Sequence, residues 1–241
     1  MRKKIILLIA IFFINIGCLN ASNELSKDYL CSTIWGPFDG RFGLYIEFNS
    51  DNTLKLYSFD ETLSKSNGEY YIKNDKLISK IYKNYSMFEY LPNEFKKKSI
   101  TWILKNEENT IWYTKKLVSD NGLEFWDMNS KVKNGTIVTY KNIKMMVIMP
   151  EEIKLKNNTN AREKPGINEK KIEFITSDNA KQKVISYIPK DHTVRIYART
   201  LKKERLQDME DYWYYCELLY SWMANTTNKS RYGWIYGGIL K

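Results

Sequence analysis

Short runs of alternating apolar and polar residues, separated by turn residues, make up most of the chain from about residue 32 onward. In the clearest run, residues 42–48, aromatic and aliphatic side chains alternate with small or polar ones, which is the pattern of a strand with one buried face. A turn cluster follows at residues 49–52, and the pair Asn67-Gly68 is typical of a two-residue hairpin. Because such runs recur at intervals of roughly 8–12 residues, they predict an antiparallel sheet closed as a barrel or folded as a sandwich.

The same pattern locates further strands and divides the chain. Later strands are predicted at residues 53–59, 69–73, 76–82, 99–105, 110–118 and 123–128. Residues 84–98 are the segment in which we expect a helix or a long loop. We expect an antiparallel β domain over residues 23–135, a linker or connecting strand over 136–152 and a second domain over 153–241.

The first 22 residues have the features of an export signal. A positive start (Arg2, Lys3 and Lys4) precedes a ten-residue apolar run at residues 5–14, and small residues follow. That run is too short for a helix that spans ~30 Å of hydrocarbon, which needs ~20 residues. We therefore expect an exported protein.

The way in which the signal is processed stays open among three interpretations. Residues 14–18 resemble a bacterial lipobox, whose Cys becomes the acylated first residue; here it is Cys18, with Asn15 in place of the usual aliphatic residue. Acylation of Cys18 predicts a lipoprotein held at a membrane, because two or more acyl chains anchor a protein stably. Cleavage after Ala21 predicts a periplasmic or secreted protein instead, and the third interpretation is an uncleaved anchor.

Four ordered blocks in residues 153–241 resemble the bacterial SH3 (SH3b) family. The blocks are Asn160-Ala161-Arg162 with Pro165-Gly166, Tyr187-Ile188-Pro189-Lys190, Trp213-Tyr214, and Gly233-Trp234 with a closing Ile239-Leu240. The resemblance implies a small β-barrel that binds cell-wall peptide or protein partners. The sequence departs from the family pattern at Ala161, Asp191 and Cys216, which replace an aliphatic residue, the turn glycine and a core valine.

The N-terminal part resembles the lipocalin-like domains of small bacterial lipoproteins. The resemblance lies in Trp35-Gly36, a strand, an Asp-Asn-Thr turn, a second strand, and the Gly-Glu-Tyr-Tyr-Ile-Lys run of residues 68–73. It implies a meandering barrel whose interior holds one small apolar ligand. The alternative is a solid core filled by the aromatic side chains of these strands.

The net charge bears on the classes of partner, and the aromatic content bears on the secondary structure. The 241 residues carry a formal net charge of +10, of which three units belong to the export signal. The other basic residues are scattered through predicted turns and, together with the export signal, lead us to expect no nucleic-acid partner. Aromatic residues make up 15% of the chain, which favours half-buried strands over helices.

Few residues suit catalysis. His192 is the single histidine, which excludes a multi-His metal site and a two-His acid/base pair. It lies in a predicted surface turn. With no Gly-rich phosphate loop or metal-ligand cluster in the sequence, we expect no enzymatic activity, no metal and no cofactor. If Cys18 is acylated, Cys31 and Cys216 remain as a pair that export would allow to form a disulfide. Alternatively, Cys216 is a small apolar core residue.

Aromatic residues concentrate near the C-terminus and supply the candidate binding site. We single out Tyr214, Tyr220, Trp222 and Trp234, because rings with polar tips suit sugars and peptides; for Trp234 a core position is the alternative. The sequence thus predicts an all-β protein, with an N-terminal antiparallel meander barrel or sandwich and a small C-terminal SH3-like β-barrel. We expect an exported, non-catalytic envelope protein that binds peptidoglycan or another envelope protein. The alternative function is a carrier of small apolar ligands in the N-terminal barrel.

Overall fold

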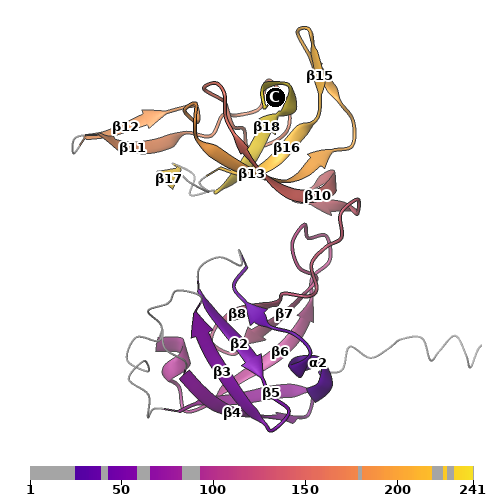
Figure 1. The fold of residues 1–241 in the computed structure, drawn as a ribbon, viewed down its shortest axis with the longest axis vertical. Helices are drawn as coiled ribbons and strands as arrows, with labels where there is room; N and C mark the ends of the chain where they lie inside the picture. The colour runs from indigo at the N-terminus through magenta and orange to yellow at the C-terminus, as the bar shows by residue number, and fades with distance from the viewer. Residues whose placement is uncertain are drawn as a thin grey trace, which may run out of the picture. The chain divides into compact units, whose positions relative to one another are not determined.

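A computed structural model of the chain confirms the all-β fold class. It describes residues 25–38, 43–58, 66–82, 93–178, 181–218, 225–226 and 231–240. The chain folds as two compact units, each described here by itself (Figure 1). Unit 1 comprises Met1–Glu107 and Tyr113–Ser130, and unit 2 comprises Glu108–Trp112 and Lys131–Lys241. In the described part of the chain, no helix has the length and apolarity needed to cross a membrane.

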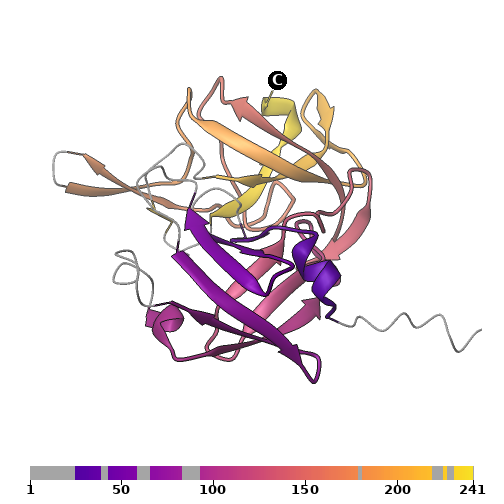
Figure 2. The same cartoon turned by 60° about the horizontal axis from the view of Figure 1, so that its bottom comes forward.

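Unit 1, which lies in the indigo to magenta part of Figure 2, is a closed antiparallel barrel of strands β1 to β8. Strand β8 returns to pair with β1. Its elements are α2 Lys27–Cys31, β1 Trp35–Gly36, β2 Leu44–Phe48, β3 Thr53–Ser58, β4 Ser66–Lys73, β5 Lys76–Ile81, η2 Asn93–Lys96, β6 Ile100–Asn106, β7 Lys115–Ser119 and β8 Glu124–Asp127. The barrel is one of the two architectures expected for this part of the chain, and the predicted helix or loop contains only the short η2 within the described residues.

Large side chains are buried in the interior of the barrel. The period-two alternation buries Leu54 and Leu56 on β3, and Leu77 on β5 faces Trp102 on β6 in the strand register. Trp35 is fully buried and its indole nitrogen donates to the carbonyl of Leu30, which ties α2 to the first strand. The described interior residues form one contiguous hydrophobic cluster, as expected for a solid core.

Unit 2 is built on a five-stranded sheet with the order β18-β16-β13-β10-β9. The strands are β9 Ile137–Tyr140, β10 Ile143–Lys154, β13 Thr193–Thr200, β16 Trp213–Glu217 and β18 Tyr232–Tyr236. Smaller elements are β11 Phe174–Asp178, β12 Lys181–Ile185 and β17 Asn225–Thr226, which form a second sheet, the hairpin of β14 Glu204–Leu206 and β15 Met209–Asp211, and η3 Gly237–Ile239. The SH3b resemblance of this unit stays a prediction.

Residues 136–152, predicted as a linker or connecting strand, form β9 and most of β10 in the five-stranded sheet of unit 2. Two other segments differ from the sequence-based expectation. The pair Asn67-Gly68, predicted as a two-residue hairpin, lies inside β4 and pairs with β3. The strand predicted at residues 110–118 begins only at Lys115, because residues 108–112 leave the barrel strands and belong to unit 2. There Trp112 packs edge-on against Tyr197, with ring centroids 4.2 Å apart.

The turn at Asp191 has a backbone conformation that favours glycine. Asp191 has a φ of 67°, the left-handed conformation that glycine adopts most readily and that Asp tolerates better than most residues. Its backbone nitrogen donates to the carbonyl of Leu155 at 2.7 Å, and the Leu155 nitrogen donates to the carbonyl of His192 at 2.8 Å. The turn therefore closes against β10 without a glycine.

Both described cysteines are free thiols, so the structure contains no disulfide between Cys31 and Cys216. Cys216 is fully buried in the core of unit 2, as expected of a small apolar residue. Burial raises the pKa of its thiol. Cys31 is partly exposed, with Sγ 3.3 Å from the Tyr70 hydroxyl.

Candidate functional site

The two neighbouring strands β16 and β18 separate a core face from an aromatic face. On the core face, Tyr214 packs with Cys216 against the hydrophobic cluster of unit 2. On the other face, Tyr215 lies opposite Trp234 in the strand register, and Glu217 lies opposite Tyr232. The aromatic face therefore arises from period-two alternation in two paired strands.

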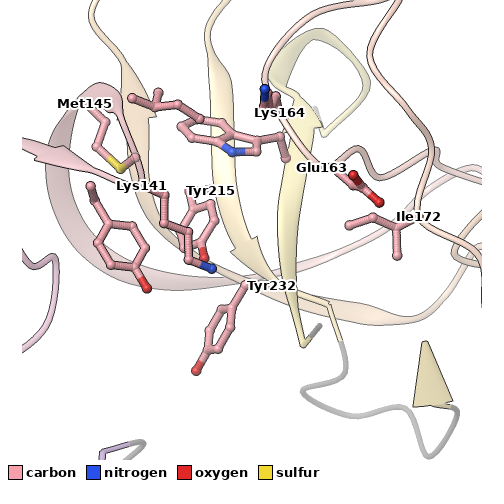
Figure 3. A pocket seen from close by; sticks show the side chains of 10 residues that line it. Lys141, Met145, Glu163, Lys164, Ile172, Tyr215 and Tyr232 are labelled. Atoms are coloured by element: carbon pink, nitrogen blue, oxygen red, sulfur yellow. The ribbon is translucent and has the colours of Figure 1, made fainter. Parts of the chain in front are cut away.

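A pocket of about 270 Å³ opens on this aromatic face, and we call it the aromatic pocket (Figure 3). Its walls are Tyr140, Lys141, Ile143, Met145, Glu163, Lys164, Ile172, Tyr215, Tyr232 and Trp234. Figure 3 shows Lys141 and Met145 on one side of the pocket and Glu163, Lys164 and Ile172 on the other. Segments distant in sequence thus meet around the two aromatic strands.

The aromatic rings hold one another in place. Tyr215 is stacked on Tyr232 with centroids 5.8 Å apart, meets Trp234 at 5.3 Å, and meets Tyr140 edge-on at 5.9 Å. The β9–β10 turn lies at the rim of the pocket, where it contributes Lys141. Lys141 and Asn142 both adopt left-handed backbone angles (φ of 49° and 63°), as a tight hairpin requires.

A buried polar group faces this pocket. Tyr215 is 3% exposed, and its hydroxyl makes no hydrogen bond of ordinary geometry with any described residue. Burial raises the pKa of Tyr215, and the neighbouring Tyr140 and Tyr232 raise it further, so the phenol is neutral and able to donate at pH 7. An unpartnered buried hydroxyl is costly, and a ligand acceptor would remove that cost.

The charged groups around the pocket have different roles. Lys141 and Lys164 are exposed on its rim, whereas Glu163 is paired with Lys170 at 3.2 Å. The fully buried Glu217 accepts hydrogen bonds from the Tyr197 hydroxyl at 2.9 Å and from Arg231 at 2.7 Å. These bonds satisfy its carboxylate and fix the far end of β16.

Other candidate chemistry lies away from the pocket. His192 is half-buried beside its turn, with Nδ1 3.4 Å from the carbonyl of Lys190, and does not line the aromatic pocket. Among the residues that the structure describes, no three His, Cys, Asp or Glu side chains are grouped so that they could hold a metal ion.

The structure brings one of the predicted ligand-binding residues to the pocket. Trp234 lines it although it is 1% exposed, so it is both a core residue and a pocket wall. Tyr214 does not reach the pocket, because it lies on the core face with its ring against Gly237. Tyr220 and Trp222 lie outside the described residues, as does Cys18.

Sequence reasoning missed Tyr140, Lys141 and Tyr215 as pocket residues. The position of Tyr215 was accessible from alternation, since it is one residue from Tyr214 and must face the other way. Tyr140 and Lys141 were placed in a linker or connecting strand, and only the pairing of β9 with β10 carries them to the site.

Comparisons of the chain with protein-family models, curated proteins and solved structures find no match.

Proposed function

We propose that this chain is an exported, non-catalytic binding protein of the bacterial cell envelope, and that unit 2 binds peptidoglycan through the aromatic pocket. The observation that carries the proposal is the buried hydroxyl of Tyr215, which makes no hydrogen bond of ordinary geometry with a described residue, in a pocket walled by tyrosine and tryptophan. The SH3b resemblance and the export signal support the same function from the sequence. Another envelope protein is the alternative partner.

The chemistry of the pocket suits a glycan that carries peptides. Aromatic faces pack against sugar rings, and the neutral Tyr215 phenol donates to a hydroxyl or carbonyl oxygen. The rim ammonium groups of Lys141 and Lys164 attract carboxylates, which peptidoglycan carries on its peptide stems. A ligand with rings and carboxylates would therefore use both parts of the site.

The packed barrel of unit 1 favours this function over a carrier of apolar ligands. Trp35, Trp102 and Phe95 are among the largest fully buried side chains of the chain, and all belong to the interior cluster of the barrel. A carrier needs an apolar cavity in that interior, and these buried rings occupy volume that a ligand would need. We therefore place the binding site in unit 2.

The experiment is co-sedimentation of the full chain with purified peptidoglycan. Lys141→Glu replaces attraction at the rim with repulsion, and we expect about tenfold weaker retention than for the unchanged chain. Lys144→Glu is the matched control. Lys144 is exposed, as Lys141 is, but it lies on β10 and does not line the pocket. Equal losses in the two variants, or no retention of the unchanged chain, would contradict the proposal.

A further inference from the structure

Unit 2 has a second pocket, separate from the aromatic pocket, which we call the arginine pocket. Its volume is about 360 Å³, and it shares no lining residue with the first. Its walls are Asn160, Arg162, Ile167, Arg205, Leu206, Gln207, Met209, Trp213, Tyr236 and Ile239. Most of these side chains are apolar or aromatic, and the others are two arginines and two amides.

Arg162 is the unusual group in this pocket. It is 7% exposed, and its Nη1 donates to the backbone carbonyl of Glu169 at 2.5 Å. No carboxylate in the described part of the chain pairs with its guanidinium. A buried charge without a counter-ion is costly, and guanidinium binds carboxylate through two parallel hydrogen bonds. A ligand carboxylate would supply the missing counter-ion.

The backbone of Arg162 is fixed by strand β18, and its guanidinium is held by the bond to the Glu169 carbonyl. Its nitrogen donates to the carbonyl of Trp234 at 2.9 Å, and its carbonyl accepts from the Trp234 nitrogen at 2.8 Å. These paired bonds attach the Arg162 segment to the edge of β18. The base of the Arg162 side chain is therefore anchored to a strand.

The opposite wall is the β14–β15 hairpin, which one hydroxyl clamps. The single proton of the Tyr236 hydroxyl is shared between the carbonyls of Glu204 (2.7 Å) and Met209 (2.9 Å), and the hydroxyl oxygen accepts from the Asp211 nitrogen (3.0 Å). In addition, Trp213 Nε1 donates to the Glu204 carboxylate at 2.5 Å. The hairpin wall is therefore held in place before any ligand binds, which makes the site preorganised.

We propose that the arginine pocket binds the free C-terminal carboxylate of a peptide whose last residue is apolar. The carboxylate would pair with Arg162, and the apolar side chain would lie against Trp213, Met209 and Ile239. The amides of Asn160 and Gln207 would hydrogen-bond to the last peptide group. This inference goes beyond the proposed function, since it concerns a different pocket and a different ligand group.

The two amides favour a peptide over a fatty acid. A fatty acid presents a carboxylate and an apolar chain but has no peptide group for Asn160 and Gln207 to bind. Their polar atoms would then lose water without gaining a partner, which weakens binding. A peptide terminus provides a partner for the guanidinium, for the apolar side chains and for the two amides.

The test is calorimetric titration of the full chain with three probes: acetyl-alanyl-leucine with a free carboxylate, the same dipeptide as its C-terminal amide, and decanoate. We expect the free acid to bind at least about tenfold more tightly than the amide, because only the acid can pair with Arg162. We also expect decanoate to bind more weakly than the acid dipeptide.

Variants assign the effect to the pocket. Met209→Glu introduces a carboxylate into the wall and should bind the acid dipeptide at least about tenfold more weakly than Met209→Gln, which has the same length without the charge. Val184→Glu adds the same charge at an exposed position outside the pocket, so we expect no change. Arg162→Met should abolish the preference for acid over amide; if that variant does not fold, the Met209 pair decides.

Three results would overturn the inference. Equal affinities for the acid and the amide would exclude carboxylate recognition, and tighter binding of decanoate would assign the pocket to lipid. Absence of binding by all three probes would show that the pocket takes no such ligand. None of these results bears on peptidoglycan retention through Lys141, so the two proposals fail separately.

Discussion

At the scale of single residues, Tyr215 carries a buried polar group on a well-packed ring. Its hydroxyl makes no hydrogen bond of ordinary geometry with a described residue, while its ring is stacked on Tyr232. Removal of such a hydroxyl deletes an unmet polar group but leaves the ring packing intact. Tyr215 therefore allows stability and binding to be separated.

We predict that Tyr215→Phe leaves the free energy of unfolding at pH 7 unchanged or higher by about 1 kcal/mol, while it weakens retention on peptidoglycan. Urea unfolding and co-sedimentation measure the two effects. Tyr71→Phe is the control, since Tyr71 is 54% exposed on the barrel of unit 1. A loss of stability with unchanged retention would show that the hydroxyl is structural.

The same variant has a pH signature. The pKa of Tyr215 is raised in the folded state, so the folded chain keeps a proton that the unfolded chain releases above pH ~10. Its contribution to stability is complete below that pH and is lost as the pH rises further. Above pH 10 we therefore expect the unfolding free energy of the unchanged chain to fall more steeply than that of Tyr215→Phe, by up to ~1.4 kcal/mol per pH unit.

At the scale of elements, local signals predicted one two-residue turn correctly and misplaced another. The pair Asn67-Gly68, predicted as a hairpin, lies inside β4, where Gly68 pairs with Leu54 of β3. Asn74 and Asp75, between β4 and β5, both adopt left-handed angles (φ of 51° and 56°), as expected of a two-residue turn. By contrast, the strand predicted at residues 110–118 was wrong in its first half. Ile111 and Trp112 alternate poorly with their neighbours and are buried by packing in unit 2, which no local pattern encodes.

The β14–β15 hairpin depends on a tertiary contact, because only three residue pairs join its strands. We predict that Tyr236→Phe lowers the free energy of unfolding by about 1–3 kcal/mol, since the hydroxyl bonds to Glu204, Met209 and Asp211. Hydrogen exchange should become faster at the Asp211 amide. Tyr212→Phe serves as the comparison, and equal exchange in both variants would show that the clamp contributes nothing.

At the scale of the whole molecule, the chain alternates between its two units. Residues 108–112 lie between β6 and β7 in sequence but belong to unit 2, and the boundary recurs at Ser130. Within unit 2 the Val132 nitrogen donates to the Trp112 carbonyl at 2.7 Å, and Trp112 packs on Tyr197 and Tyr232. The second unit is therefore assembled from two separate stretches of sequence.

Location is also a property of the whole chain, and the lipid anchor proposed at Cys18 can be tested directly. We predict that Cys18→Ser abolishes incorporation of a fatty-acid analogue in bacterial cells and releases the protein from the membrane fraction. Cys31→Ser provides the control, because Cys31 is a free thiol in unit 1. Undiminished labelling of Cys18→Ser would favour cleavage after Ala21 or an uncleaved anchor.

The sequence by itself determined the all-β class, the two-residue turn between β4 and β5 and the two faces of β16. These properties depend on alternation and turn chemistry, which act between residues close in sequence. Only the tertiary structure decided that Trp234 is both core and pocket wall, that Tyr140 and Lys141 join it, and that Arg162 is buried without a carboxylate partner among the described residues. Those properties depend on which strands pair and which side chains exclude water, and both are set by contacts between residues far apart in the chain.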